Sequence, residues 1–274
     1  MPISQNLRKL IDLNSPLWAG EAEIIRTYWT SPVRTRATDK LWLKRQCWKE
    51  YAGLGDSEGT TIGMVGDLEV KLKRMVPRID VDVDRHELEE LLEKVYVEYR
   101  HYCLFSDIYD TMLDPGEPKL NANKLEPWPE EVALASRRVA VKRSNKKLGW
   151  RATDFTEGGC CTMYSEGAKL KGKPGLDGMI GRACQKVFDD EYGHMMHGVV
   201  GIDDVGMTKG DWDELAELTL EQLRLRIYMR NAEFSHPVSD QRIKEILDGK
   251  VEPIKFDYAR AEAYLDEAHG GAAE

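Results

Sequence analysis

Two copies of the motif Glu-x-x-His constrain what this chain can fold into. One is Glu98-x-x-His101 and the other is Glu191-x-x-His194. Residues three apart on a helix project from the same face, so each motif can present a carboxylate and an imidazole to one metal ion. A single motif of this kind arises by chance on any charged helix. Two of them on separate helices predict a dinuclear metal site in a helical bundle, to which two further helices each contribute one glutamate.

Helix signals account for most of the sequence, and no repeat or strand-rich region interrupts them. We expect helices over residues 15–29, 38–54, 57–76, 84–112, 129–170, 176–200, 208–234, 239–247 and 257–268. Segments rich in glycine and proline separate these helices. The prediction is an all-α fold in which residues 1–274 form a single domain. Its metal-binding four-helix bundle spans about 57–200, with accessory helices in 15–54 and 208–268.

Composition excludes several classes of protein. With 32% charged residues and a mean hydropathy of −0.51, the chain is expected to be soluble. The net charge of −9 disfavours a nucleic-acid partner, which would normally meet a basic face. Five cysteines without a Cys-x-x-Cys pair indicate reduced thiols rather than a disulfide framework. No signal peptide or membrane-spanning run is apparent, so we expect a cytoplasmic protein without a membrane partner.

Glu157 is the first of the two additional carboxylates that the metal site needs. It lies on the predicted helix that precedes the second motif. The residues that share its helical face look inward, and they are Trp150, Thr153, Cys160, Cys161 and Tyr164. An acid on such a face needs a counter-charge, because an unpaired buried carboxylate is costly. Gly158 and Gly159 follow it, and small residues there favour close helix packing or leave room for a ligand.

Glu69 is the second additional carboxylate, and helical phase selects it over Asp67. The positions on the face of Glu69 are apolar, namely Ile62, Val65, Leu72 and Val76. Asp67 instead shares its face with Thr60, Lys71 and Arg74, and polar residues of this kind are typical of a solvent-exposed helix face. Glu69 is therefore expected to point into the bundle.

The predicted ligand and catalytic set contains four carboxylates and two imidazoles. Its members are Glu69, Glu98, His101, Glu157, Glu191 and His194. Two divalent ions would neutralise the four negative charges and make these buried groups tolerable. Oxygen and nitrogen donors without thiolate suit iron or manganese better than structural zinc. The expected cofactor is two iron ions, with a manganese–iron pair as the alternative.

This arrangement resembles the ferritin-like di-iron carboxylate superfamily over about residues 57–200. The superfamily includes bacterial multicomponent monooxygenases, the ribonucleotide reductase small subunit, acyl-carrier-protein desaturases and arylamine N-oxygenases. The gaps of 29, 59 and 34 residues between successive carboxylates are similar to those of the monooxygenase and reductase branch. The resemblance implies a ferritin-like four-helix bundle. It also implies that Asp190, just before the last motif, hydrogen-bonds a ring nitrogen of His101 and orients it.

The resemblance also bears on the surroundings of the metals. Phe105 stands four residues after His101, where the reductase has its radical tyrosine, which argues against a reductase. Cys161 matches a position that lines the monooxygenase pocket, although a packed thiol is an equal alternative. His197 is either a third histidine ligand, as in the N-oxygenases, or a polar residue that lies beside the ligands or is partly exposed. The expected pocket residues are Tyr102, Phe105, Cys161, Tyr164 and Phe188.

The function expected from this resemblance is a non-haem di-iron oxygenase or oxidase. It would use O2 and external electrons to oxidise a small organic substrate by hydroxylation, N-oxygenation or a similar reaction. The chain has no dinucleotide, flavin or iron–sulfur motif, so a separate reductase or ferredoxin is expected to supply the electrons. A homodimer is an open alternative to a monomer. The alternative function is ferritin- or rubrerythrin-like handling of iron or peroxide. A third hypothesis, tRNA hydroxylation, is disfavoured by the acidic charge.

Overall fold

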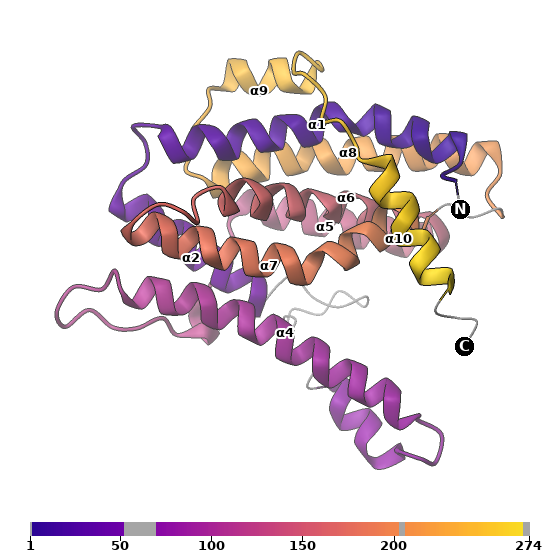
Figure 1. Cartoon of the computed structure of the whole chain (residues 1–274), viewed down its shortest axis with the longest axis horizontal. Helices are drawn as coiled ribbons and strands as arrows, with labels where there is room; N and C mark the ends of the chain where they lie inside the picture. Colours follow the sequence, from indigo (N-terminus) through magenta and orange to yellow (C-terminus); the bar gives the residue numbers. More distant parts are fainter. Residues whose placement is uncertain (1, 52–69, 203–205, 271–274) are drawn as a thin grey trace.

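The computed structural model describes residues 2–51, 70–202 and 206–270, and this part of the chain is helical without a β-strand (Figure 1). The side chains of 157, 159–161 and 267–270 are outside that description. The all-α prediction is confirmed for the described residues. The helices are α1 (Gln5–Thr30), α2 (Arg36–Tyr51), η1 (Val76–Arg78), α4 (Arg85–Asp110), η2 (Ala122–Lys124), α5 (Pro129–Ser144), α6 (Lys146–Ala168), α7 (Gly175–Val200), α8 (Lys209–Glu233), α9 (Asp240–Leu247) and α10 (Tyr258–Gly270).

Helix α1 begins ten residues earlier than the sequence predicted. Ser4 caps it, because its hydroxyl accepts a hydrogen bond from the backbone N–H of Leu7 at 3.2 Å. Pro16, expected near the helix start, lies inside the helix. A proline there leaves the carbonyl four residues earlier without its N–H donor. The hydroxyl of Ser15 donates to that carbonyl, of Asp12, at 3.1 Å, and so restores the missing hydrogen bond.

The single helix predicted over 129–170 is wrong, since the chain folds back at Asn145 into α5 and α6. The Asn145 side chain accepts from the backbone N–H of Leu148 at 3.0 Å and caps α6. A Cβ at Gly149 would lie only 2.7 Å from the Cα of Lys142, so glycine permits the close approach of the two helices. Charged residues around 137–147 masked this break in the sequence, because they read as one continuous solvated face.

Two groups of helices meet at α7 (Figure 1). In the larger group, α6 packs against α1, α5, α7 and α8, and α9 lies on the outer side of α1. In the second group, α4 packs against α2 and α7, while its N-terminal half projects away from the body. The C-terminal half of α4 therefore lies where α2 and α7 also come together, and the predicted motifs of α4 and α7 share this region.

A buried ionic contact holds α2 against α8. The Glu233 side chain is fully buried, and its Oε1 accepts from Gln46 Nε2 at 2.7 Å and from Lys49 Nζ at 2.9 Å. Burial alone would raise the pKa of Glu233, but the charges of Arg230 and Lys49 outweigh it and lower the pKa to about 2. The contact fixes the rotation of α2 about its axis at Lys49, the residue before Glu50.

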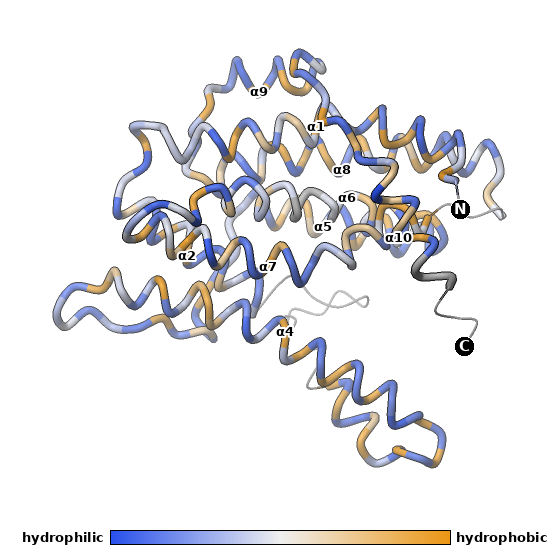
Figure 2. The backbone as a smooth tube through the Cα atoms, viewed as in Figure 1, coloured by the Kyte–Doolittle hydropathy of each residue, from blue (hydrophilic) through white to orange (hydrophobic). Residues whose placement is uncertain are grey.

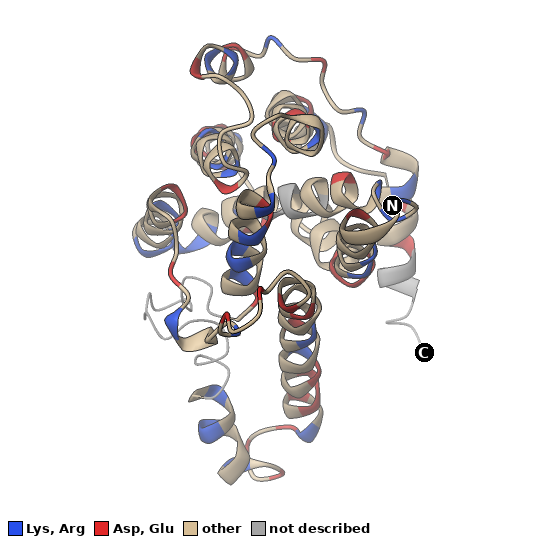
Figure 3. Ribbon diagram, turned by 90° about the vertical axis from the view of Figure 1, so that its left-hand side faces the viewer, with Lys and Arg blue, Asp and Glu red and all other residues tan. Residues whose placement is uncertain are grey.

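The described helices alternate apolar and polar residues along their length, and the projecting half of α4 does the same (Figure 2). Acidic and basic residues are interspersed over the face that Figure 3 presents. None of the described helices combines the length and apolarity that crossing a membrane requires.

We predict that Gly20→Ala destabilises the protein by about 1–3 kcal/mol, because α9 packs directly on this glycine. A Cβ there would lie 2.1 Å from Cγ2 of Ile246, a side chain with no exposed surface. Urea denaturation measures the change in free energy of unfolding. Gly193→Ala is the control, since its new methyl meets no atom within 4 Å. That control should stabilise its helix by about 0.5–1 kcal/mol. Equal stability of Gly20→Ala and the parent chain would refute this packing account.

Candidate metal centre

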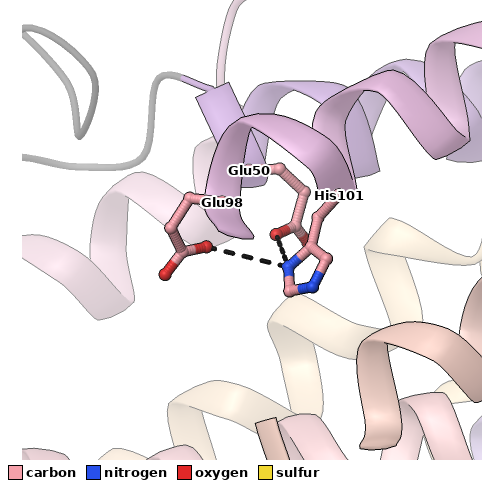
Figure 4. Close-up of side chains that lie close together, drawn as sticks. All are labelled: Glu50, Glu98 and His101. Atoms are coloured by element: carbon pink, nitrogen blue, oxygen red, sulfur yellow. Dashed lines mark ion pairs between the residues drawn. The ribbon is translucent and has the colours of Figure 1, made fainter. Parts of the chain in front are cut away.

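Glu50, Glu98 and His101 form a compact group that could hold a metal ion (Figure 4). One donor atom from each of the three lies within 4.8 Å of the other two. Glu50 and His101 are buried, and the side chain of Glu98 is 13% exposed. Glu50 comes from the last turn of α2, whereas Glu98 and His101 come from α4. The first predicted motif therefore acts with a carboxylate of a neighbouring helix.

The His101 ring is held between carboxylates on both sides. Its Nε2 lies 3.0 Å from Oδ2 of Asp190, so the hydrogen bond that the resemblance implied is present. Its Nδ1 faces three further carboxylates, at 3.4 Å from Glu50, 3.8 Å from Glu191 and 3.9 Å from Glu98. Since Asp190 and Glu191 lie on α7, the ring joins α2, α4 and α7 at one point.

Two buried polar atoms in this cluster have no hydrogen-bond partner among the described residues, namely Nδ1 of His101 and Oε1 of Glu191. With the proton on Nε2 shared with Asp190, the lone pair of Nδ1 points at acceptor oxygens only. Such a contact is stable when a cation stands between the atoms, either as a proton on the ring or as a metal ion. The residues present therefore fit a cation at this position.

The electrostatics of the cluster also favour a bound cation. Burial, together with the charges of Glu50 and Glu191, raises the pKa of Glu98 to about 8. Burial on its own would lower the pKa of His101, but Glu50, Asp190 and Glu98 outweigh it and raise that pKa to about 9. Asp190 remains ionised because its hydrogen bonds to Lys186 and His101 overcome its burial and lower its pKa. The buried carboxylates thus favour a positive charge in the cluster, as a bound proton or as a metal ion.

Tyr164, expected as a pocket residue, supports Glu50 instead. Its hydroxyl donates to Oε1 of Glu50 at 2.5 Å, and its ring stacks on that of Phe105 with centroids 6.2 Å apart. Phe105 is fully buried and contacts Trp42 edge to face. An apolar wall therefore covers this side of the cluster, and one oxygen of Glu50 is fixed by the phenol.

The second motif lies at the solvent side of the cluster. Oε2 of Glu191 is 3.2 Å from Nδ1 of His194, and Oε1 of Glu191 faces His101. The His194 side chain is 68% exposed, compared with 22% for Glu191. Glu191 thus connects the two predicted motifs.

The remaining predicted site residues fall into two classes. Glu69 lies outside the described residues, and so do the side chains of Glu157 and Cys161 on α6. His197 is exposed on α7, with no described contact to the cluster. Tyr102 is half-buried next to Tyr51, at 5.2 Å between ring centroids. Phe188 lines a different hollow, described below.

Glu50 is the site residue that the sequence interpretation missed. The site consequently reaches beyond the range 57–200 into a helix that was expected to be accessory. The signal was available, because Leu43 and Cys47 precede Glu50 on one helical face and both are buried. An acid that follows apolar residues at these spacings meets the same criterion that selected Glu69.

The fold and the cluster define an all-helical protein with a buried carboxylate–histidine group suited to a metal ion. No family model matches this chain, and no match is found among curated proteins or among solved structures. The description of this protein as a candidate metal-binding helical protein therefore depends on Glu50, Glu98 and His101 themselves.

We predict that Glu50→Ala abolishes tight metal binding at the site formed by Glu50, Glu98 and His101, because it removes one of three converging donors. Fe(II) bound per chain, measured anaerobically by equilibrium dialysis, should fall by at least one ion. The control is Glu90→Ala, which removes an exposed acid of the same helix as Glu98. Unchanged stoichiometry in Glu50→Ala would exclude Glu50 as a ligand.

We predict that the metal-free protein loses stability as the pH rises from about 4.5 to 9. Glu98 and His101 hold their protons more tightly in the folded chain, with pKa values of about 8 and about 9 against 4.5 and 6.5. Unfolding therefore releases protons, and the free energy of unfolding falls with rising pH, by several kcal/mol. Chemical denaturation in the presence of a chelator measures it.

Glu98→Gln should make this pH profile shallower and remove the fall between about pH 4.5 and 6.5, because an amide does not titrate and only His101 still contributes. Glu93→Gln, an exposed position on the same helix, should leave it unchanged. A parent protein whose stability stays constant across this pH range would contradict the electrostatic account of the cluster.

Proposed function

We propose that this chain is a ferritin-like dinuclear iron oxygenase or oxidase that uses O2 to oxidise a small organic molecule. The four bundle helices in this proposal are α2, α4, α6 and α7. They would supply Glu50, the Glu98–His101 motif, Glu157 and the Glu191–His194 motif in that order along the chain. This is the pattern of two lone glutamates and two Glu-x-x-His motifs, with Glu50 in the place first given to Glu69.

The observation that carries the proposal is a pair of buried atoms that have no hydrogen-bond partner in the described part of the chain, Nδ1 of His101 and Oε1 of Glu191. They lie 3.8 Å apart in a cluster rich in carboxylates. Each unpaired buried polar group costs about 1–3 kcal/mol. A bound cation would contact both of these atoms, which would explain why the folded protein keeps them buried and close together.

The donor set favours iron or manganese, because it offers carboxylate oxygens and imidazole nitrogen without thiolate. Glu50, Glu98 and His101 would hold one ion, and Glu157, Glu191 and His194 would hold the second. When bound, reduced iron supplies the activation of O2 that no amino-acid side chain can provide.

The protein residues around the cluster have their own tasks. Asp190, paired with Lys186, keeps the proton of His101 on Nε2 and so leaves Nδ1 as the donor. Tyr164 holds the Glu50 carboxylate in place and can pass it a proton. Phe105 excludes water from this side. Exposed His194 marks the side from which ions, O2 and substrate can enter.

A separate electron donor is part of the proposal, because turnover as an oxygenase consumes two electrons and the sequence contains no redox-cofactor motif. The donor would be a reductase or ferredoxin. The competing function, handling of iron or peroxide, needs no organic substrate, and this difference separates the two experimentally.

We predict that the protein loaded with Fe(II) consumes O2 and incorporates ¹⁸O from ¹⁸O2 into members of a panel of small aromatic amines and phenols, given a chemical reductant. His101→Gln should reduce O2 consumption at least about a hundredfold, since it removes a donor to the metal. His86→Gln, an exposed histidine of the same helix, should match the parent protein. Rapid O2 or peroxide consumption that is independent of every organic compound tested would instead identify an iron- or peroxide-handling protein.

A further inference from the structure

A hollow lies away from the Glu50–His101 cluster, between α1, α6, α7 and the segment that leads into α10. Its volume is about 380 Å³. This lies within the range of small-molecule sites, about 300–1,000 Å³. Its walls are mostly apolar and include Trp18, Phe188, Tyr192, Met195, Val199 and Phe256.

Helix α7 separates this hollow from the candidate metal centre. Phe188, Tyr192, Met195 and Val199 recur every three to four residues and form one stripe that lines the hollow. Asp190 and the Glu191–His194 motif occupy the neighbouring face, towards α4. On the opposite wall, Gly158 of α6 keeps the hollow open, since a Cβ there would lie 3.1 Å from Cγ2 of Val199.

The rim of the hollow carries an excess of positive charge, although the chain as a whole is acidic. Arg26 is paired with Glu166 at 2.8 Å, and Lys169 also contacts that carboxylate at 2.7 Å. Lys255 and Arg260 also line the hollow, and within the described part of the chain neither forms an ion pair. The Arg260 guanidinium lies over the Tyr192 ring, 3.8 Å from its centroid.

Asp257 is the remaining acid of the rim, and it is engaged locally. Its Oδ1 accepts from the backbone N–H of Arg260 at 3.0 Å, as an N-terminal helix contact. An anionic group at the mouth would therefore meet two cations, and an attached apolar body would meet aromatic rings and methionines. Methionine side chains adapt readily to apolar ligands of different shape.

We propose that this hollow binds a small anionic amphiphile, an apolar chain or ring with one carboxylate, of which a medium-chain fatty acid is the simplest example. Lys255 and Arg260 would receive the carboxylate, and the stripe on α7 would receive the apolar body. The proposal is independent of the metal chemistry, because its binding residues and its test involve no metal ion.

The experiment is isothermal titration calorimetry of the full-length, metal-free protein with monomeric decanoate as the probe. Decanol and decyltrimethylammonium share the tail but carry a neutral and a cationic head. Decanoate should bind one per chain, at least about tenfold more tightly than either analogue, because only it complements the rim charge. Equal affinity for all three probes, or no binding of decanoate, would overturn the proposal.

Two variants assign the site. Lys255→Glu combined with Arg260→Glu should weaken decanoate binding at least about tenfold by charge reversal. The control is Lys146→Glu combined with Lys244→Glu, which makes the same charge change at exposed positions elsewhere and should have no effect. Thr162→Trp, which fills the hollow from α6, should abolish binding while circular dichroism confirms folding. Unaltered affinity in either test variant, or binding to anionic vesicles in place of monomeric decanoate, would refute the site.

Discussion

The imidazole of His101 is the constraint on which the candidate metal centre depends. It has no exposed surface, one nitrogen bonded to Asp190, and the other directed at carboxylates of α2, α4 and α7. A buried ring in this setting favours a positive charge, as a bound proton or as a metal ion, because carboxylates of three helices face its Nδ1. The same ring therefore ties three helices together and sets the charge that the cluster needs. Burial and the charges of Glu50 and Glu191, which face the same ring, raise the pKa of Glu98 to about 8.

The rest of the structure places carboxylates around that ring with defined orientations. On α2, Gln46 and Lys49 bind buried Glu233 of α8, and the next residue, Glu50, is directed to His101 and is held by Tyr164. On α7, Asp190 is held by both Lys186 and His101. These contacts cost conformational freedom and desolvation, and they are the kind of support that keeps metal ligands in place. The cluster thus resembles a prepared binding site more than a chance meeting of surface charges.

The sequence predicted the parts of this site that depend on helical spacing. The all-α class and the Glu98–His101 motif follow from residues a few positions apart on recognisable helices, whereas the contact of Asp190 with His101 was implied by the family resemblance. Glu50 could not be ranked from phase alone, because the helix of Glu69 offered an equally apolar face and only tertiary packing brings α2 against α4. The break at Asn145 was hidden by continuous helix-favouring residues, and the early start of α1 depended on Ser15 compensating Pro16. In each of these cases a specific contact of a side chain determined a ligand or a helix boundary that hydrophobic periodicity alone does not specify.

Helix α7 has two faces with different chemistry. One faces a carboxylate–histidine cluster, and the other faces an apolar hollow with a basic rim. The central claim is that the cluster around His101 binds metal. Anomalous diffraction at the iron edge, from crystals grown anaerobically with Fe(II), tests it most directly. The account predicts two peaks about 3.5–4 Å apart, one of them at bonding distance from Glu50, Glu98 and Nδ1 of His101. Crystals with full iron occupancy elsewhere and none beside His101 would contradict it.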